Sequence, residues 1–86
     1  MRKGRFVIGQ YYEFTDWFTG EILGRLVTSV GINHVWFTVF NKTNPDEPKS
    51  YEDRDILLDD NDNEYVLLYI YQDNEARIYA DIINVI

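Results

Sequence analysis

The sequence predicts a small, mainly β domain: an antiparallel barrel of five to six short strands. Apolar and polar residues alternate with a period of two along most of the chain, which is the pattern of half-buried strands. Turn signals such as Thr19-Gly20 and Gly31-Ile32-Asn33 divide these runs at short intervals. Short, curved strands with one apolar face usually close into a small barrel, because closure leaves no exposed sheet edge.

The first half of the chain predicts three consecutive strands. From Phe6 to Phe14 the even positions are nearly all apolar, as on the buried face of a strand. The run 22–30 carries apolar residues on both faces, and Gly24 within it indicates a bulge or a sharp bend. The run 34–40 alternates again, so three runs joined by short turns predict an antiparallel meander.

The middle of the chain is a loop followed by an ambiguous segment. Residues 41–50 contain two prolines and two asparagines and predict a loop. Ser50 with Asp53 three places on resembles a helix capping box, so one short helix near 50–58 is an alternative. We favour a short, irregular strand that begins near Asp55.

Two further strands, 65–71 and 76–86, are predicted on either side of an Asp-Asn hairpin turn within 72–75. If residues 66, 68 and 70 point inward, Tyr65, Tyr69 and Tyr71 share the outward face. Tyr79 lies on the outward side of the next strand, and Trp36 joins them if its own strand buries the residues beside it. Tyr and Trp anchor protein interfaces. This tyrosine face is therefore a partner or self-association surface, unless a loop or a helix covers it.

Part of this pattern resembles a known class of fold. The stretch GQYYEFTDWFTGEILGRLVTSVGINHVWFTVF, residues 9–40, looks like the opening of small SH3-like β-barrel modules, which commonly show a bent strand of GxLV type and then a strand of VxFxV type. The resemblance is one of spacing and carries over no functional residues. It implies a binding module, because such barrels are seldom catalytic. In such modules aromatic residues near the first turn, here Tyr11, Tyr12, Trp17 and Phe18, can line a peptide groove.

Composition favours a soluble, cytoplasmic protein. The 86 residues suit one domain, 1–86, and the 16% of aromatic residues supply area for a dense core. The chain has no cysteine, which excludes disulfides and thiolate chemistry and fits a reducing compartment. The start MRKGRF has no apolar stretch behind it, and the longest apolar run is seven residues, so we expect neither a signal peptide nor a membrane span.

The segment DDNDNE, residues 59–64, has six consecutive side chains that end in carboxylate or amide oxygens. Counted from Asp59 as an EF-hand calcium loop, it places Asn61 and Asn63 acceptably. It has Glu64 where the turn glycine belongs and Ile70 where the bidentate glutamate belongs. We favour a solvated hairpin turn, since Asp and Asn side chains bond to nearby backbone amides. A partner surface and a metal site of another kind are the alternatives; we predict no metal and no cofactor.

The net charge of −7 lies entirely in the second half of the chain. Residues 1–40 carry four basic and three acidic side chains, whereas residues 41–86 carry four basic and twelve acidic ones. Such a field repels nucleic acid and anionic lipid and favours basic protein partners. The acidic residues could simply keep the protein soluble. Alternatively, ordered carboxylates imitate a phosphate backbone and occupy a channel lined by Lys and Arg; phage-encoded inhibitors of nucleases and of CRISPR effectors are similar in size and charge.

The sequence does not indicate an enzyme. His34 is the only histidine, and we expect it to be a surface turn residue. Ser29 and Ser50 lie in no nucleophile motif.

The favoured function is therefore an acidic protein-binding module, in its specific form an inhibitor or nucleic-acid mimic that engages a basic surface of a nucleic-acid-handling protein. The alternative is an assembly subunit that oligomerises through the tyrosine face, and a small-ligand or metal-binding module is the third possibility. The candidate partner-binding residues are Trp36, Asp55, Asp59, Asp60, Asp62, Glu64, Tyr65, Tyr69 and Tyr71.

Overall fold

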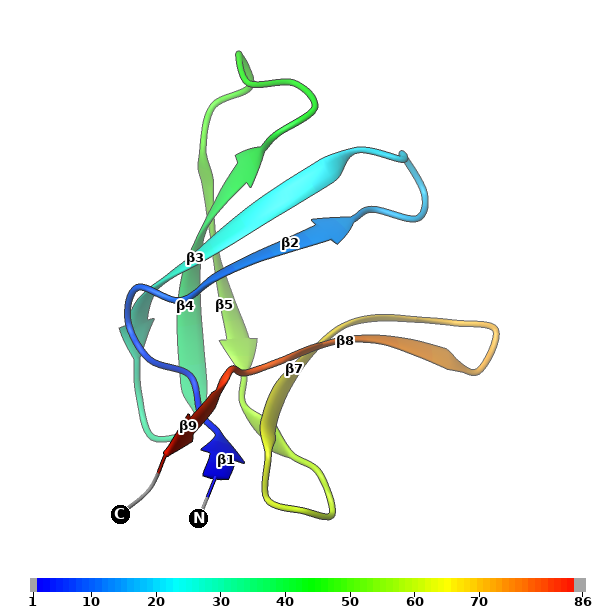
Figure 1. Ribbon diagram of the computed structural model, residues 1–86. Helices are drawn as coiled ribbons and strands as arrows, with labels where there is room; N and C mark the ends of the chain where they lie inside the picture. The colour runs from blue at the N-terminus through cyan, green and yellow to red at the C-terminus, as the bar shows by residue number, and fades with distance from the viewer. Residues whose placement is uncertain (1, 85–86) are drawn as a thin grey trace.

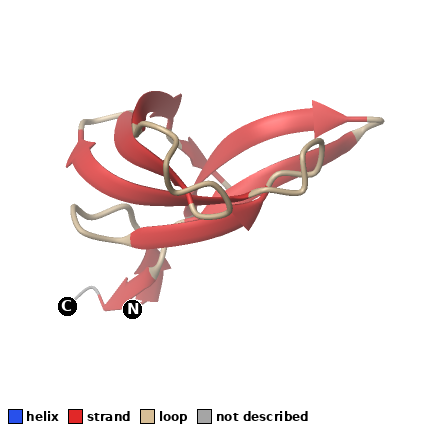
Figure 2. Cartoon of the chain, turned by 90° about the horizontal axis from the view of Figure 1, so that it is seen from above, coloured by secondary structure: helices blue, strands red, loops and turns tan. Residues whose placement is uncertain are grey.

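The computed structural model describes residues 2–84, and within that range it contains nine β-strands and no helix (Figures 1 and 2). The strands are β1 (Arg2–Gly4), β2 (Tyr11–Thr15), β3 (Ile22–Val30), β4 (His34–Asn41), β5 (Ser50–Asp55), β6 (Leu57–Leu58), β7 (Glu64–Tyr71), β8 (Asn74–Tyr79) and β9 (Ile82–Asn84). No helix in this part of the chain is long and apolar enough to cross a membrane.

The strands form three antiparallel sheets, so the mainly β, antiparallel prediction is confirmed. The largest has the order β2-β3-β4-β5, a second has β6-β7-β8, and the third pairs β1 with β9. The predicted three-strand meander within residues 6–40 is present as β2, β3 and β4, which pair in that order. The sheets do not close into one barrel over residues 2–84, because β5 and β7 face each other without a ladder of backbone hydrogen bonds.

The prediction of five to six strands is too low: β1 lies before the first predicted run, and the segments 50–58 and 76–86 are each divided between two strands with different partners. The first predicted strand begins only at Tyr11, since residues 5–10 form a turn in which Gly9 has a φ of 97° and the Gln10 side chain accepts the N–H of Val7. The last predicted strand is interrupted after Tyr79. There the Ala80 N–H still donates to Glu64 of β7, but the next residue bonds to the N-terminal segment.

The segment 50–58 is extended, so the helix alternative is wrong, and the strand begins at Ser50 rather than near Asp55. Strand β5 pairs with β4 along its whole length, and its side chains alternate. Tyr51 and Asp53 are exposed, whereas Glu52 and Arg54 are half-buried and face the second sheet. This alternation is the period of a strand at the edge of a sheet with one covered face.

The core lies between the inner face of the four-stranded sheet and the β7–β8 hairpin. Its fully buried side chains include Val27, Val35 and Phe37 from the first sheet and Val66 from β7. The ring of Phe6, from the segment before β2, packs edge-on against Phe37 with 6.0 Å between centroids. Buried apolar area of this kind is the main stabilising term of a small domain.

The expected irregularity at Gly24 is not a bulge. The register of β3 and β4 shifts between Val27 and Ser29 instead. A Cβ atom at Gly24 would lie 2.1 Å from the hydroxyl oxygen of Tyr11, so this glycine gives room for an aromatic side chain that crosses the strand.

Candidate functional site

The acidic segment 59–64 is the turn between β6 and β7, as predicted. One oxygen of the Asp59 carboxylate accepts the backbone N–H groups of Asn61 and Asn63 at 2.8 and 2.9 Å. These hydrogen bonds favour the charged carboxylate and hold the pKa of Asp59 below its ordinary value. The Asp59 carboxylate is therefore used inside the turn.

The same turn holds the N-terminal segment in place. The Asn63 side-chain oxygen accepts the backbone N–H of Gly4 at 2.9 Å, and the Glu64 carboxylate accepts that of Phe6 at 2.8 Å. Because Phe6 is part of the core, these bonds fix a strand end that is nearly sixty residues away in sequence. Glu64 has a structural role, which the sequence did not indicate.

Asp60 and Asp62 are the exposed carboxylates of this turn. Asp62 has a positive φ of 61°. Its carboxylate forms a salt bridge with Lys3 at 3.2 Å, and its backbone carbonyl accepts a hydrogen bond from the Arg5 guanidinium. The Asp60 carboxylate has no hydrogen-bond partner among the residues that the structure describes. Nowhere in residues 2–84 do three or more His, Asp or Glu side chains come together in a group that could hold a metal ion.

The predicted tyrosine face is divided between the two sides of the β7–β8 hairpin. The register of β7 shifts between Leu67 and Tyr69, and this extra residue reverses the alternation that follows it. Ile70, expected to point inward, is 62% exposed. The expectation that Tyr65, Tyr69 and Tyr71 share one face is therefore wrong.

On the outer side, Tyr65 packs against Tyr79 at 5.3 Å, and the Arg77 guanidinium lies 4.3 Å from the Tyr65 ring. On the inner side, the remaining two tyrosines join residues of β2 and of the turn after it. We name these five residues the aromatic cluster: Phe14, Trp17, Phe18, Tyr69 and Tyr71.

Trp36 lies apart from all the tyrosines of β7, on the outer face of the four-stranded sheet. It is opposite Asp53 of β5 in the ladder, and its side chain is 38% exposed. His34 stacks on Trp36 and donates its Nδ1–H to the Asp53 carboxylate at 2.9 Å, and its Nε2 lies 3.4 Å from the Asp55 carboxylate. The hydrogen bond to Asp53 raises the pKa of His34, so at acidic pH the half-exposed His34 is a cation shared between two carboxylates.

An open hollow of about 400 Å³ follows the free edge of β5 beside these residues. Its polar rim is His34, Asp53 and Asp55, and its apolar wall is Leu57 and Leu67. Arg54 also lines the hollow, but its guanidinium donates hydrogen bonds to the backbone carbonyls of Leu67 and Leu68 in β7. We name the group of Trp36, Asp53 and Asp55, with this hollow, the β5 edge site.

The second-half carboxylates do not gather on one face. They lie at the loop after β4, on β5, in the turn after β6 and at the β7–β8 turn, which project in different directions in Figure 1. Of the nine candidate residues, Trp36 and Asp55 lie at the β5 edge site, Asp59, Asp60, Asp62 and Glu64 lie at the turn after β6, Tyr69 and Tyr71 belong to the aromatic cluster, and Tyr65 lies on the other side of the hairpin. Asp53 and the 79% exposed Tyr51 belong with Trp36 and Asp55 and were missed. The alternation of residues 51, 53 and 55 was the signal that could have found them.

Comparisons of this chain with protein-family models, with curated proteins and with solved structures give no match.

Proposed function

We propose that this protein is a binding module that receives a basic side chain of a partner protein at the β5 edge site. The observation that carries the proposal is the combination, at one sheet edge, of a leucine-walled hollow, two exposed carboxylates and a partly exposed tryptophan. Both carboxylates are more than half exposed, and their only charged neighbour among the described residues is the half-exposed His34.

The fit of a lysine or arginine follows from the geometry of the hollow. The long aliphatic stem of such a side chain packs on apolar surface while its charged end stays in water. Here Leu57 and Leu67 offer the apolar wall, and Asp53 and Asp55 offer the counter-charges. An arginine would in addition stack on the ring of Trp36, in competition with His34.

The aromatic contact supplies most of the affinity in this proposal. Exposed ion pairs contribute about 0–1 kcal/mol each, because water and salt screen them. A buried tryptophan at the centre of an interface can contribute about 2 kcal/mol or more. The two aspartates would therefore act mainly on the association rate and on the choice of a basic partner.

The specific form of the proposal is an inhibitor or adaptor of a nucleic-acid-handling protein, since the surfaces of such proteins are rich in Lys and Arg. The net charge of −7 supports attraction to such a surface. The local pair of aspartates, rather than an extended row that copies a phosphate backbone, carries the recognition. The likeness of residues 9–40 to SH3-like modules belongs to the same proposal, and the consecutive antiparallel strands β2, β3 and β4 support it.

The test compares capture from a bacterial lysate on four immobilised proteins. These are the wild type, Trp36→Ala, Asp53→Asn/Asp55→Asn, and the charge-matched control Asp60→Asn/Asp73→Asn. We expect the first two variants to lose a basic protein that the wild type and the control retain. Equal retention by the two double variants would show that net charge, and not the β5 edge site, determines binding.

Competition with His34 gives the same proposal a second test. The pKa of His34 is raised by Asp53, so the imidazolium is present at acidic pH and is lost as pH rises. Capture by the wild type should therefore increase between about pH 6 and about pH 8, the range in which histidines titrate. His34→Gln should remove that increase.

An assembly subunit is the second candidate, and the aromatic cluster favours it. Trp17 and Phe18 are each more than half exposed although they pack against Tyr71. Exposed aromatic patches mark interaction surfaces, including contacts between copies of one chain. Sedimentation of wild type and Trp17→Ala over a range of concentrations tests it: a wild-type dimer that becomes a monomer in the variant supports self-association, and two identical monomers reject it.

A further inference from the structure

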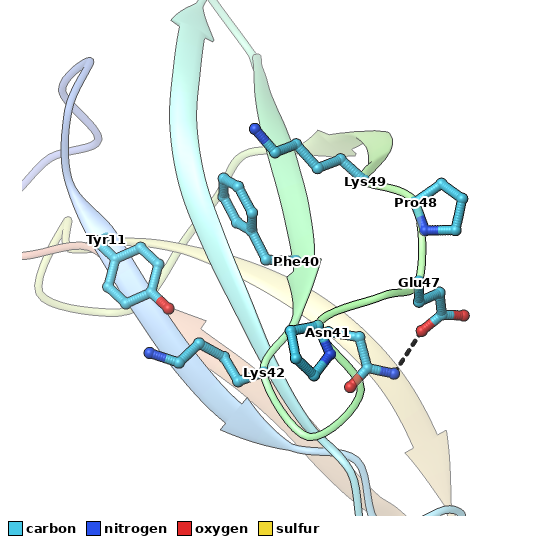
Figure 3. A pocket seen from close by; sticks show the side chains of 8 residues that line it. Tyr11, Phe40, Asn41, Lys42, Glu47, Pro48 and Lys49 are labelled. Atoms are coloured by element: carbon cyan, nitrogen blue, oxygen red, sulfur yellow. Dashed lines mark hydrogen bonds between the residues drawn. The ribbon is translucent and has the colours of Figure 1, made fainter.

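We propose that a second site, at the opposite end of the outer sheet face, binds a small molecule that combines a flat aromatic ring with a carboxylate. The site is an open pocket of about 620 Å³ between β2, the end of β4 and the loop before β5 (Figure 3). We name it the lysine pocket. Its lining residues are Tyr11, Phe40, Asn41, Lys42, Pro45, Glu47, Pro48 and Lys49.

Aromatic rings and prolines supply the apolar part of the lysine pocket. The rings of Tyr11 and Phe40 come from two different strands (Figure 3). Pro45 and Pro48, from the loop before β5, also line the pocket. Ligand sites are usually lined by aromatic and apolar groups with a few polar groups that fix orientation, in a volume of about 300–1,000 Å³. This pocket matches that description, and its shape favours a planar ring.

The loop that forms one wall is held by its own hydrogen bonds. Asn41 is buried, its side-chain oxygen accepts the N–H groups of Thr43 and Asn44, and its amide nitrogen donates to Glu21 and Glu47. The wall is thus formed before any ligand arrives, which lowers the entropic cost of binding.

The charged side chains that line the pocket are Lys42, Lys49 and Glu47, so its lining is net positive although the net charge of the protein is −7. The Glu47 carboxylate accepts the side-chain amide of Asn41. Figure 3 shows the two lysines on either side of the Phe40 ring. Lys42 is already paired, with Nζ 3.2 Å from Glu13.

Lys49 is the group that would receive an anion. Within residues 2–84 no carboxylate forms a salt bridge with it; its Nζ lies 5.1 Å from the centre of the Phe40 ring instead. A carboxylate is a stronger partner for an ammonium group than an aromatic face is, because the hydrogen bond is then charge-assisted on both sides. A ligand that carries its carboxylate at the edge of a ring would bond to Lys49 while the ring covers Phe40.

The lysine pocket is separate from the β5 edge site. Phe40 and Trp36 are four residues apart on β4, about 13 Å along an extended strand. The two sites attract opposite charges, so a failure of one proposal leaves the other standing.

The experiment titrates ¹⁵N-labelled protein with three probes of the same ring system: 2-naphthoate, the neutral 2-naphthamide and the cationic 2-naphthylmethylamine. We expect 2-naphthoate to shift the amide signals of residues 40–49, and to bind several-fold more tightly than the amide, with the amine weakest. Equal affinity for the acid and the amide overturns the role of the lysines. Shifts that centre on Trp17 and Phe18 instead overturn the pocket.

Two variants then test whether Lys49 is the group that binds the carboxylate of the ligand. Lys49→Gln should weaken 2-naphthoate binding about tenfold, as expected for a lost charge-assisted hydrogen bond, and leave 2-naphthamide unchanged. Lys3→Gln makes the same change in net charge at the far end of the molecule and should leave both affinities unchanged. If Lys49→Gln and Lys3→Gln weaken 2-naphthoate equally, only long-range charge acts and the assignment to Lys49 is wrong.

Discussion

Replacing Glu52 with leucine should destabilise the fold strongly, because it removes the partner of a buried arginine. Arg25 on β3 is 6% exposed, and its Nε lies 2.5 Å from the Glu52 carboxylate of β5. Its Nη1 is buried without a hydrogen-bond partner among the described residues. The same carboxylate lies 3.4 Å from Arg54. In Glu52→Leu the Arg25 charge would stay inside the protein with nothing to balance it.

The magnitude follows from the burial of the pair. Removing one partner of a buried ion pair costs about 3–5 kcal/mol, because the other charge is left uncompensated. The Glu52 side chain is 23% exposed, so water screens the pair in part and the lower end applies. A domain of this size has a free energy of unfolding of about 4–13 kcal/mol. A loss of about 3 kcal/mol should lower the melting temperature by about 12–24 °C.

Urea denaturation followed by tryptophan fluorescence would measure this effect in Glu52→Leu, Arg25→Met and the double variant. The double variant should recover most of the loss, because apolar residues of similar volume often replace a buried ion pair without cost. A loss below about 1 kcal/mol in Glu52→Leu, the range of an exposed pair, would refute the reasoning. So would a double variant that is no more stable than Glu52→Leu.

The same network predicts a pH dependence of stability. Burial acts to raise the pKa of Glu52, but the hydrogen bonds and charges of Arg25 and Arg54 outweigh it, and the pKa lies below its ordinary value of 4.5. A carboxyl group whose pKa is lowered by folding stabilises the fold above its unfolded pKa, and this stabilisation is lost as the pH falls through the folded pKa. Below pH 4.5 the wild type should therefore lose stability more steeply than the double variant.

Three further predictions concern single positions. Asp59→Ala should speed hydrogen exchange of the two turn amides that its carboxylate accepts, with little change elsewhere, as NMR would show; unchanged exchange would mean that the turn forms without them. Asp53→Asn should lower the pKa of His34 toward 6.5 in an NMR titration, because the hydrogen bond that raises it loses its charge; an unchanged pKa would point to Asp55 as the cause. Gly24→Ala should displace the Tyr11 ring, because the new Cβ would lie 2.1 Å from its hydroxyl oxygen. The fold should persist, and 2-naphthoate binding at the lysine pocket should weaken; an unmoved Tyr11 resonance would contradict this.

The alternating pattern was sufficient to find most of the strands. The predicted runs 22–30, 34–40 and 65–71 match the bounds of β3, β4 and β7 to within one residue. Successive side chains of a strand point to opposite faces, so the burial of each face is visible in the residue types. The Asp and Asn residues of 59–64 identified the turn, because such side chains accept hydrogen bonds from nearby backbone amides. Both features depend on neighbours only a few residues apart.

The candidate site was predicted less well, because its members meet only in the folded chain. Trp36 and Asp53 are seventeen positions apart in sequence and face each other across a ladder. The tyrosines were assigned to one face because a regular period of two was assumed along β7, whose run YVLLYIY is apolar on both faces. The extra residue between Leu67 and Tyr69 is set by the register with β8 and by the contacts of β7 with β5, and no local pattern marks it.

The sequence by itself determined the class of fold, the cysteine-free composition and the excess of acidic residues in the second half. Tertiary structure alone decided what the acidic residues do. Asp59 and Glu64 accept backbone amides and Glu52 balances a buried arginine. Asp53 and Asp55 lie exposed at a sheet edge beside Trp36, with His34 between them. The physical reason is that composition fixes how many charges a chain carries, whereas the long-range pairing of strands fixes which of them face backbone, another charge or water.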